Sequence, residues 1–440
     1  MKNRRKSKRM IRFMPFLLLL IVLVIIGGYF FTANSNQAEN AAGNQKAEQH
    51  TDSTKNLTKK ETNQKADRNK EVSTFSQVQK QTDTSIEEKV DDLLAEMTLE
   101  EKIGQLMVIG FDGKEINDHA KTMINEYKVG GIIYYDRNME SPGQVTKLSN
   151  DLQQLALNNA KQIPLLISID QEGGQIVRMR DKVSNIPSQQ ELGKNGSSQA
   201  VYDSALKNGQ ELKTMGIHVN FAPVLDLSET DSRSFGIDPK KTAELGEQAI
   251  AGFTDAGITA TLKHFPGNGR SNIDPHHETS SVEANQLDLE NNDIYPFKKM
   301  IDEVDHRSFF TMVTHIKYPA YDKENPASIS RVIISELLRK KLSYTGIVVT
   351  DDLEMGAVNK YFTYEDLGFS AIDAGADLLL VCHTLESQKE VFKGIQKAVQ
   401  EKKLSEERID EAVKRILSFK LQSIKETNLN IETAENTVGK

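Results

Sequence analysis

The chain has 440 residues and a formal net charge of −8 at pH 7. The first 12 residues contribute +7 and include no acidic residue, so the remainder carries −15 and is a poor binder of nucleic acid. The single cysteine, Cys382, excludes an internal disulfide, a CxxC redox site and a cysteine-based zinc site.

An uncharged stretch of 19 residues, 13–31, follows the basic segment 1–12 and is long enough to span a bilayer. Because seven Lys and Arg residues precede it, the N-terminus is expected in the cytoplasm and the rest of the chain outside. We therefore expect a signal-anchor in the cell membrane and an extracytoplasmic folded part. The alternative is a cleaved signal peptide and a secreted protein, although such peptides usually have a shorter apolar region that ends in small residues.

Residues 32–84 are rich in Asn, Gln, Lys, Glu, Thr and Ser and contain few bulky apolar side chains. Such a segment cannot bury enough surface to offset the entropy of ordering, so we expect a flexible polar linker. The folded part is expected over 85–425. It begins with two capping boxes, Ser85 to Glu88 and Thr98 to Glu101, and is followed by a polar C-terminal tail at 426–440.

Eight short apolar, β-branched runs alternate with longer amphipathic stretches along the folded part. Strands that are buried on both faces and separated by crossover helices indicate a parallel sheet. Eight such repeats favour a closed (β/α)8 barrel of the TIM type, with an open doubly wound sheet as the alternative. The runs are 106–110, 131–135, 164–170, 218–223, 258–264, 309–315, 346–351 and 377–383.

Polar residues stand where several of these runs end. One such residue alone could cap a helix or bond a loop in any fold, but in a barrel the carboxyl ends of the strands share one rim, where catalytic residues gather. The sequence therefore predicts a site at that rim. The residues are Asp170, Lys263, His264, His315, Asp351, Asp352 and His383.

The segment after the fifth run carries the sequence KHFPGNG at 263–269 and then Asp274-Pro275-His276. An aspartate that accepts from one ring nitrogen of a histidine fixes the tautomer and leaves the other nitrogen for proton transfer. The alternative is that the histidines at 276 and 277 are solvated loop residues. No HxH or HExxH motif is present, so no metal site is expected.

Five motifs together resemble glycoside hydrolase family 3, and they occur in the expected order over about residues 88–420. Within the family, the chain most resembles the bacterial β-N-acetylglucosaminidases of the single-domain type. The motifs are IDQEGG at 169–174, RSFG at 233–236, KHFPG at 263–267, THIKYPAYD at 314–322 and GIVVTDDLEM at 346–355.

The resemblance implies a role for each matching residue. Asp351 would be the nucleophile of a retaining mechanism, and His276, supported by Asp274, would be the acid/base, with Glu278 as the alternative acid. Asp352 is expected to cap or support. Sugar binding would fall to Asp170, Arg178, Arg233, Lys263 and His264, although surface salt bridges are the common alternative for Arg and Lys.

The loop departs from the family pattern at Asn268, Arg270 and Pro275, which replace a histidine, an acidic residue and a serine. Proline restricts the conformation of Asp274 before it. The implied nucleophile, acid/base and orienting aspartate are all present, so catalysis is still expected.

The resulting prediction is an exported, membrane-anchored exo-β-N-acetylglucosaminidase that acts on peptidoglycan-derived oligosaccharides without metal or cofactor. A GlcNAc phosphorylase of the same family is an alternative, because a histidine acid/base tolerates an incoming phosphate anion. A wall-binding pseudoenzyme and a lyase that forms a Schiff base on Lys263 are two others. Asp226 and His383 are each open to a structural role or a role in the site.

Overall fold

The computed structural model describes residues 74–81, 84–195, 197–271 and 278–440. The basic segment 1–12, the expected signal-anchor 13–31 and most of the linker lie outside the described residues. Within the described ranges, no helix is both long and apolar enough to cross a bilayer.

In the described part of the chain, eight parallel strands form one sheet in the order β4-β3-β2-β1-β10-β9-β6-β5. Backbone hydrogen bonds then join the two ends of this order: Asn220 N donates to Thr259 O at 3.0 Å and Thr261 N donates to Ala222 O at 2.8 Å. The sheet therefore closes into a barrel, which confirms the (β/α)8 prediction over the open sheet. The strands are β1 (Met107–Ile109), β2 (Gly131–Tyr134), β3 (Leu166–Ile169), β4 (Val219–Asn220), β5 (Ala260–Phe265), β6 (Phe309–Val313), β9 (Val348–Asp352) and β10 (Leu378–Val381).

Each predicted apolar run overlaps one of these strands, and β5 and β9 extend one residue beyond their runs. All residues of β1, β2, β3, β5, β6 and β10 are buried, because side chains fill the barrel on one face and meet the outer helices on the other. This two-sided burial explains why the strands appear in the sequence as continuous apolar runs instead of alternating patterns.

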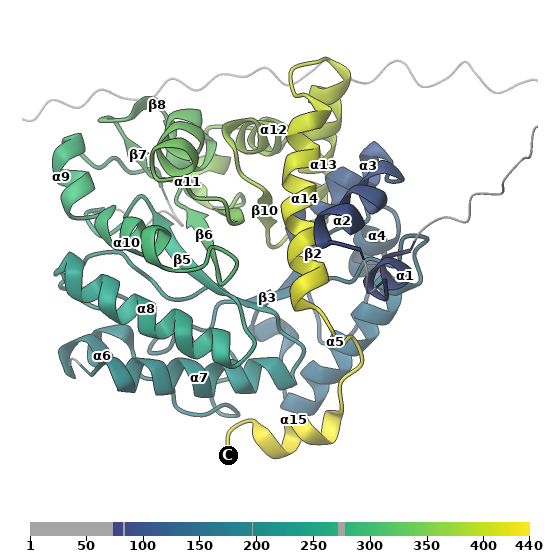
Figure 1. Cartoon of the computed structure of the whole chain (residues 1–440), viewed down its shortest axis with the longest axis horizontal. Helices are drawn as coiled ribbons and strands as arrows, with labels where there is room; N and C mark the ends of the chain where they lie inside the picture. The colour runs from purple at the N-terminus through teal and green to yellow at the C-terminus, as the bar shows by residue number, and fades with distance from the viewer. Residues whose placement is uncertain (1–73, 82–83, 196, 272–277) are drawn as a thin grey trace, which may run out of the picture. The chain divides into compact units, whose positions relative to one another are not determined.

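Helices cover the outside of the barrel, and α7 and α8 run side by side against it (Figure 1). The helices with eight or more residues are α2 (Ile86–Ala95), α4 (Asp118–Asn125), α5 (Pro142–Leu157), α7 (Ser198–Thr214), α8 (Pro239–Asp255), α10 (Tyr295–Glu303), α12 (Tyr364–Ala374), α13 (Leu385–Gln400) and α14 (Glu406–Ser423). A π-helical segment, η3 (Val332–Lys341), lies between β6 and β9.

Shorter elements complete the barrel's loops. They are α1 (Phe75–Gln79), α3 (Leu99–Gln105), η1 (Asp136–Asn138), α6 (Gln189–Asn195), α9 (Gln286–Asn291), the antiparallel pair β7 (Lys317–Tyr318) and β8 (Asp322–Pro326), η2 (Ala327–Ile329), α11 (Gly356–Asn359) and α15 (Ile431–Thr437).

The local signals for helix starts agree with the structure, with one correction. Ser85 and Thr98 form the two predicted capping boxes at α2 and α3. The amphipathic stretch 287–304, whose pattern predicts one helix, is instead two helices, because the chain leaves helical geometry at Asn292 and Pro296 then takes a first-turn position of α10. A proline has no N–H and fits the first turn better than a helix interior.

Both ends of the expected catalytic domain extend further than the sequence suggests. Helix α1 lies in the stretch expected to be linker, and its Phe75 and Val78 are buried. Helix α15 lies in the stretch expected to be a polar tail and packs against α5 and α7, with Ala434 and Val438 buried. Packing of the described chain therefore reaches beyond 85–425.

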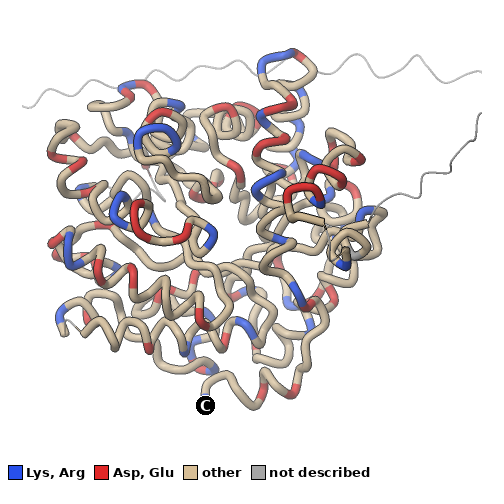
Figure 2. Tube along the Cα trace, viewed as in Figure 1, with Lys and Arg blue, Asp and Glu red and all other residues tan. Residues whose placement is uncertain are grey.

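Acidic and basic residues are interspersed along the outer helices of the described chain (Figure 2). Such mixing of positive and negative charges is typical of a solvent-exposed protein surface.

A buried carboxylate joins the amino-terminal end of the barrel to the outer helices. Asp377, directly before β10, accepts a hydrogen bond from Val348 N at 2.9 Å and contacts the guanidinium groups of Arg339, Arg408 (3.5 Å) and Arg415 (3.0 Å). Burial acts to raise the pKa of Asp377, but the three guanidinium groups outweigh burial and hold the pKa below its usual value.

Asp377→Asn is expected to lower the free energy of unfolding by about 3–5 kcal/mol, because three guanidinium groups lose their buried counter-charge. Denaturant unfolding at pH 7 measures the change. Since the folded-state pKa is depressed, the stabilisation is fully present above the unfolded value of about 3.9 and is lost as the pH falls through the folded value. The variant should therefore lose less stability on acidification than the parent.

Asp305→Asn is the matched control, because the Asp305–Arg307 pair is exposed and should contribute less than about 1 kcal/mol. Equal unfolding free energies for the parent and Asp377→Asn would contradict the role given to this cluster.

Candidate active site

The closed barrel brings the carboxyl ends of its strands to one rim, and one strand residue stands out there. Asp351 is the one residue of the eight barrel strands that is not buried; it is partly exposed near the end of β9. A carboxylate that solvent or a ligand can reach at this rim is in the position where barrel enzymes carry catalytic groups.

The surroundings of Asp351 favour its ionised form. Burial acts to raise its pKa, but the imidazoles of His264 and His315, the backbone N–H of Asp352 and the ammonium of Lys263 together hold the pKa below its usual value. The N–H of Asp352 donates to Asp351 Oδ1 at 2.9 Å. Asp351 is therefore a carboxylate at neutral pH, which is the form a nucleophile requires.

A buried network of charges lies beside it. Lys263, whose side chain is 3% exposed, places Nζ 2.7 Å from Asp170 Oδ1 and 2.7 Å from Glu172 Oε1. Arg233 holds Glu172 with two hydrogen bonds, of 2.7 Å from Nε and 2.9 Å from Nη2. Burial acts to raise the pKa of Glu172, but the two cations hold it far below its usual value. Lys263, Glu172 and Arg233 are thus ionised, and their partners fix their orientation.

Arg178 adds a donor that the protein leaves unused. Its guanidinium lies 3.9 Å from Asp170 Oδ2 and 3.4 Å from Asp136 Oδ2, and it stands over the ring of Tyr135 at 5.1 Å from the ring centre. Its Nε is buried, and no described group accepts a hydrogen bond from it. An unsatisfied buried donor at a polar rim is available to a ligand.

His264 is oriented by a single aspartate. Its Nδ1 lies 2.7 Å from Asp226 Oδ2, while Asp226 Oδ1 accepts from the backbone N–H groups of His264 (3.1 Å) and Asn268 (2.6 Å). Because a carboxylate only accepts, Nδ1 carries a proton, and Nε2 is left for other contacts. The structure thus gives Asp226 a supporting role, one of the two that the sequence left open.

Asp352 is bonded to several of the groups that surround Asp351. Its carbonyl lies 2.9 Å from His315 Nε2, and its side chain accepts from Cys382 N and Glu354 N at 3.1 Å and meets His383 Nε2 at 3.1 Å. Burial lowers the pKa of His315 and favours its neutral form. The support predicted for Asp352 agrees with these contacts.

The predicted acid/base His276 and its partner Asp274 lie outside the described residues, as does Pro275. The alternative acid, Glu278, is exposed and accepts from Tyr361 and Lys360; the hydrogen bond from Tyr361 is the main cause of a lowered pKa. A general acid at neutral pH needs a raised pKa, so Glu278 is poorly suited to that role.

Arg270, a departure from the family pattern, is fully paired with two carboxylates that lie later in the chain. Its Nε donates to Asp293 at 2.8 Å, and its Nη1 and Nη2 donate to Asp288 at 2.8 and 3.0 Å. Gly267 packs on the same Asp293: its φ is +126°, and a Cβ there would lie 2.6 Å from the Asp293 Cβ. The segment before residue 272 is therefore anchored to α9 and to the turn that follows it.

Among the described residues, no three or more His, Cys, Asp or Glu side chains are grouped so as to hold a metal ion.

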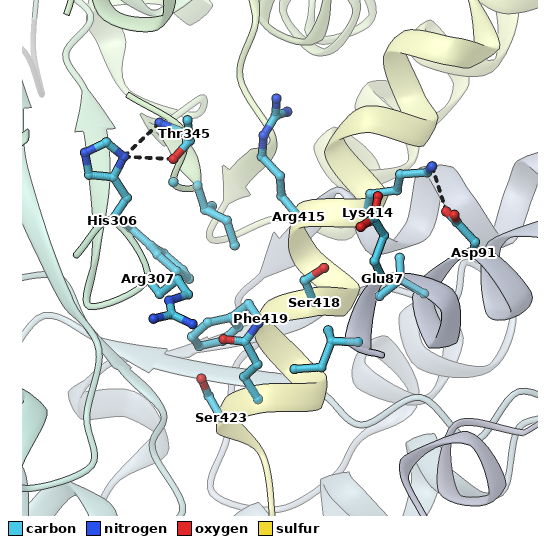
Figure 3. Close-up of a pocket in the computed structure, with 16 residues that line it drawn as sticks. Glu87, Asp91, His306, Arg307, Thr345, Lys414, Arg415, Ser418, Phe419 and Ser423 are labelled. Carbon is cyan, nitrogen blue, oxygen red and sulfur yellow. Dashed lines mark hydrogen bonds and ion pairs between the residues drawn. The ribbon is translucent and has the colours of Figure 1, made fainter. Parts of the chain in front are cut away.

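A separate cavity of about 440 Å³ lies at the opposite, amino-terminal end of the barrel (Figure 3). Its lining comes from α2, from α14 and from the starts of β6 and β9. At its edge His306 is hydrogen-bonded to Thr345, and Lys414 forms an ion pair with Asp91. In barrels of this type that end serves stability, and the cavity contributes no residue to the rim site.

The structure thus brings together the described residues that the sequence singled out. One ion-pair network contains Lys263, Asp170 and Arg178, and Glu172 connects this network to Arg233. Lys263 and His264 also lower the pKa of Asp351. Sequence reasoning gave no role to Glu172 or Asp136. The signal for Glu172 was its place in IDQEGG, two residues after Asp170; Asp136 carried no signal of its own.

Comparison with known proteins identifies the kind of barrel. Residues 98–419 match the model of the glycosyl hydrolase family 3 N-terminal domain. A β-hexosaminidase from Nitrosomonas eutropha is 33% identical over 305 residues, which cover 67% of this chain and 85% of the relative. A β-hexosaminidase A from Pseudoalteromonas piscicida is 29% identical over 344 residues, which cover 72% of this chain and 57% of the relative.

Among solved structures, a glycoside hydrolase family 3 β-N-acetylglucosaminidase from Paenibacillus sp. FPU-7 aligns with a TM-score of 0.72 at 40% identity, covering 75% of this chain and 64% of that one. The chain therefore spans somewhat under two thirds of that structure and of the Pseudoalteromonas relative.

The Asp352–His383 contact gives a prediction for the rim. The hydrogen bond to Asp352 raises the pKa of His383, against the lowering effect of partial burial. Asp352→Asn should therefore lower the pKa of His383, measured by NMR titration of the ring nitrogens. Because the folded-state pKa is raised, the stabilising contact is fully present below the unfolded value of about 6.5 and is lost as the pH rises through the folded value.

His306, which lies at the opposite end of the barrel and is bonded to Thr345 and Ile301, serves as the internal reference in the same spectra. A His383 pKa that does not change in Asp352→Asn would show that the contact is absent in solution.

Proposed function

This chain belongs to glycoside hydrolase family 3, and we propose that it is an exported, membrane-anchored exo-β-N-acetylglucosaminidase that removes terminal β-linked GlcNAc from peptidoglycan fragments. One observation carries the proposal: a partly exposed, ionised Asp351 stands at the rim of a family 3 barrel, beside the buried network of Lys263, Asp170 and Glu172. The names of the relatives, β-hexosaminidase and β-N-acetylglucosaminidase, support the choice of sugar.

In the proposed mechanism, Asp351 attacks the anomeric carbon and forms a covalent glycosyl-enzyme, which water then hydrolyses with retention of configuration. The N–H of Asp352 stabilises one carboxylate oxygen and leaves the other for attack. Lys263 and the two imidazoles keep the carboxylate ionised without pairing with it directly.

The terminal sugar would bind deep in the rim through its hydroxyl groups. Lys263 and Asp170 offer a donor and an acceptor held 2.7 Å apart, Arg178 offers an unused N–H, and His264 offers Nε2. A site built from such fixed polar groups rejects a sugar that lacks the matching hydroxyl, because a buried donor such as Arg178 Nε is then left without an acceptor.

The proton for the leaving group would come from His276, with Asp274 supporting the imidazole. A neutral histidine avoids a second carboxylate across the sugar from Asp351, and therefore avoids the like-charge repulsion that raises a carboxyl pKa. The low pKa of Glu278 is in keeping with this assignment.

The location outside the cytoplasm rests on the sequence. Seven positive charges precede the apolar stretch 13–31, which favours an inserted anchor with the barrel on the outer side, where peptidoglycan lies.

Asp351→Ala is expected to reduce kcat on an aryl β-N-acetylglucosaminide by about 10³-fold or more, because no other group can take over a nucleophile's role. Release of the aryl group, followed by absorbance or fluorescence, measures it. Asp305→Asn, at the far end of the barrel, is the control and should keep full activity. Full activity of Asp351→Ala would overturn the assignment of the nucleophile.

The same assay with and without phosphate separates hydrolysis from phosphorolysis. Free GlcNAc as the product supports the proposal, whereas phosphate-dependent formation of GlcNAc-1-phosphate would make the protein a phosphorylase.

His276→Ala should reduce the rate by about 10²- to 10⁴-fold on substrates whose leaving group needs a proton, and far less on a dinitrophenyl glycoside, which leaves as a stable anion. The comparison of a methylumbelliferyl with a dinitrophenyl glycoside measures this difference. An equal loss on both substrates would argue against an acid role for His276.

A further inference from the structure

His383 stands at the same rim as Asp351 and is attached to its neighbour. It follows β10 by two residues, its side chain is 47% exposed, and its Nε2 lies 3.1 Å from Asp352 Oδ2. Asp352 in turn donates its N–H to Asp351. His383 is therefore fixed to the residue that positions the proposed nucleophile.

Several contacts fix the orientation of the imidazole ring of His383. The backbone N–H groups of His383 and Thr384 donate to Glu354 at 2.5 and 3.1 Å, and the ring packs against Tyr135 with 5.4 Å between ring centres. Within the described chain, no group is bonded to the second ring nitrogen, Nδ1. A half-exposed ring whose orientation is fixed and whose Nδ1 has no described partner is suited to bind a ligand.

Tyr135 connects His383 to the sugar-binding groups. The guanidinium of Arg178 stands over its ring, and Arg178 also approaches Asp170 at 3.9 Å. His383 thus lies on the edge of the same polar site, one aromatic ring away from a residue proposed to bind the terminal sugar.

The terminal sugar and the leaving group of a substrate would lie at different depths in the site. Lys263 is 3% exposed and His383 is 47% exposed, so a terminal sugar held at Lys263 lies below the leaving group, which must point outward past the rim. We infer that His383 contacts the leaving-group sugar through Nδ1 and selects substrates whose leaving group is a saccharide. This inference rests on the proposed function.

A sugar hydroxyl suits both charge states of this ring. With Nε2–H donating to Asp352, Nδ1 accepts a hydrogen bond when the ring is neutral and donates one when it is charged, and a hydroxyl can do either. An aryl leaving group has no hydroxyl at the corresponding place. His383 is therefore a specificity-determining residue and not part of the bond-breaking machinery.

The competing explanation is that His383 only holds Asp352 in place. Two substitutions separate these roles, because the amide of glutamine reaches the place of Nε2 and the amide of asparagine reaches the place of Nδ1. His383→Gln keeps a donor for Asp352 and loses the contact to the sugar, whereas His383→Asn does the reverse.

The test uses the full-length chain and compares kcat/KM for a GlcNAc-containing disaccharide with kcat/KM for an aryl GlcNAc glycoside. Both chitobiose and GlcNAc-β-1,4-MurNAc are used, since the second adds a carboxylate that a charged His383 could also bind. His306→Gln, at the opposite end of the barrel, is the matched control and should leave both values unchanged.

We expect His383→Gln to lower the disaccharide-to-aryl ratio by about 3- to 10-fold, the usual effect of one lost hydrogen bond, and His383→Asn to retain more of the ratio. A loss on both disaccharides points to a shared hydroxyl, and a loss on GlcNAc-MurNAc alone points to its carboxylate; each supports the contact. An unchanged ratio in His383→Gln, or a ratio that falls only in His383→Asn, would overturn the inference while leaving the proposed function intact. Failure of the unmodified chain to cleave either type of substrate would overturn both.

Discussion

Closure of the parallel barrel is the constraint on which the other features of this structure depend. The hydrogen bonds between β4 and β5 remove the two open edges of the sheet, so all eight carboxyl ends must meet at one rim. Residues as distant in the sequence as Asp170 and Asp351 are thereby brought into one site. The strands are buried along most of their length, and their carboxyl ends at the rim are where they present polar groups to a ligand.

Buried charges are balanced at both ends of the barrel, with different results. At the amino-terminal end, Asp377 is fully buried and surrounded by three guanidinium groups. At the rim, Lys263 and Arg233 share Glu172, while Asp170 and Arg178 are only partly engaged and partly exposed. The first arrangement holds elements together. The second keeps fixed charges available beside a carboxylate whose pKa is lowered.

The sequence predicted the eight strands well, because two-sided burial produces continuous apolar runs, and several of these runs end in a polar residue that reaches the rim. It missed the break between α9 and α10, although the local residues Asn292 and Pro296 set that break. It also failed where distant residues decide the outcome, because nothing near Arg270 indicates that Asp288 and Asp293 are its partners. The role of Glu172 appears only once Lys263 and Arg233 have been folded against it. Asp274 and His276 remain predictions, as does the anchor at 13–31.

The central claim is that Asp351 becomes covalently attached to the sugar, and mass spectrometry of the trapped enzyme tests it most directly. The protein would be treated with a fluorinated GlcNAc donor that forms the glycosyl-enzyme quickly and releases it slowly, and then digested and sequenced. The account predicts a single added sugar on the peptide that contains residues 346–355, at Asp351. A label on any other residue, or turnover with inversion of configuration and no label, would contradict it.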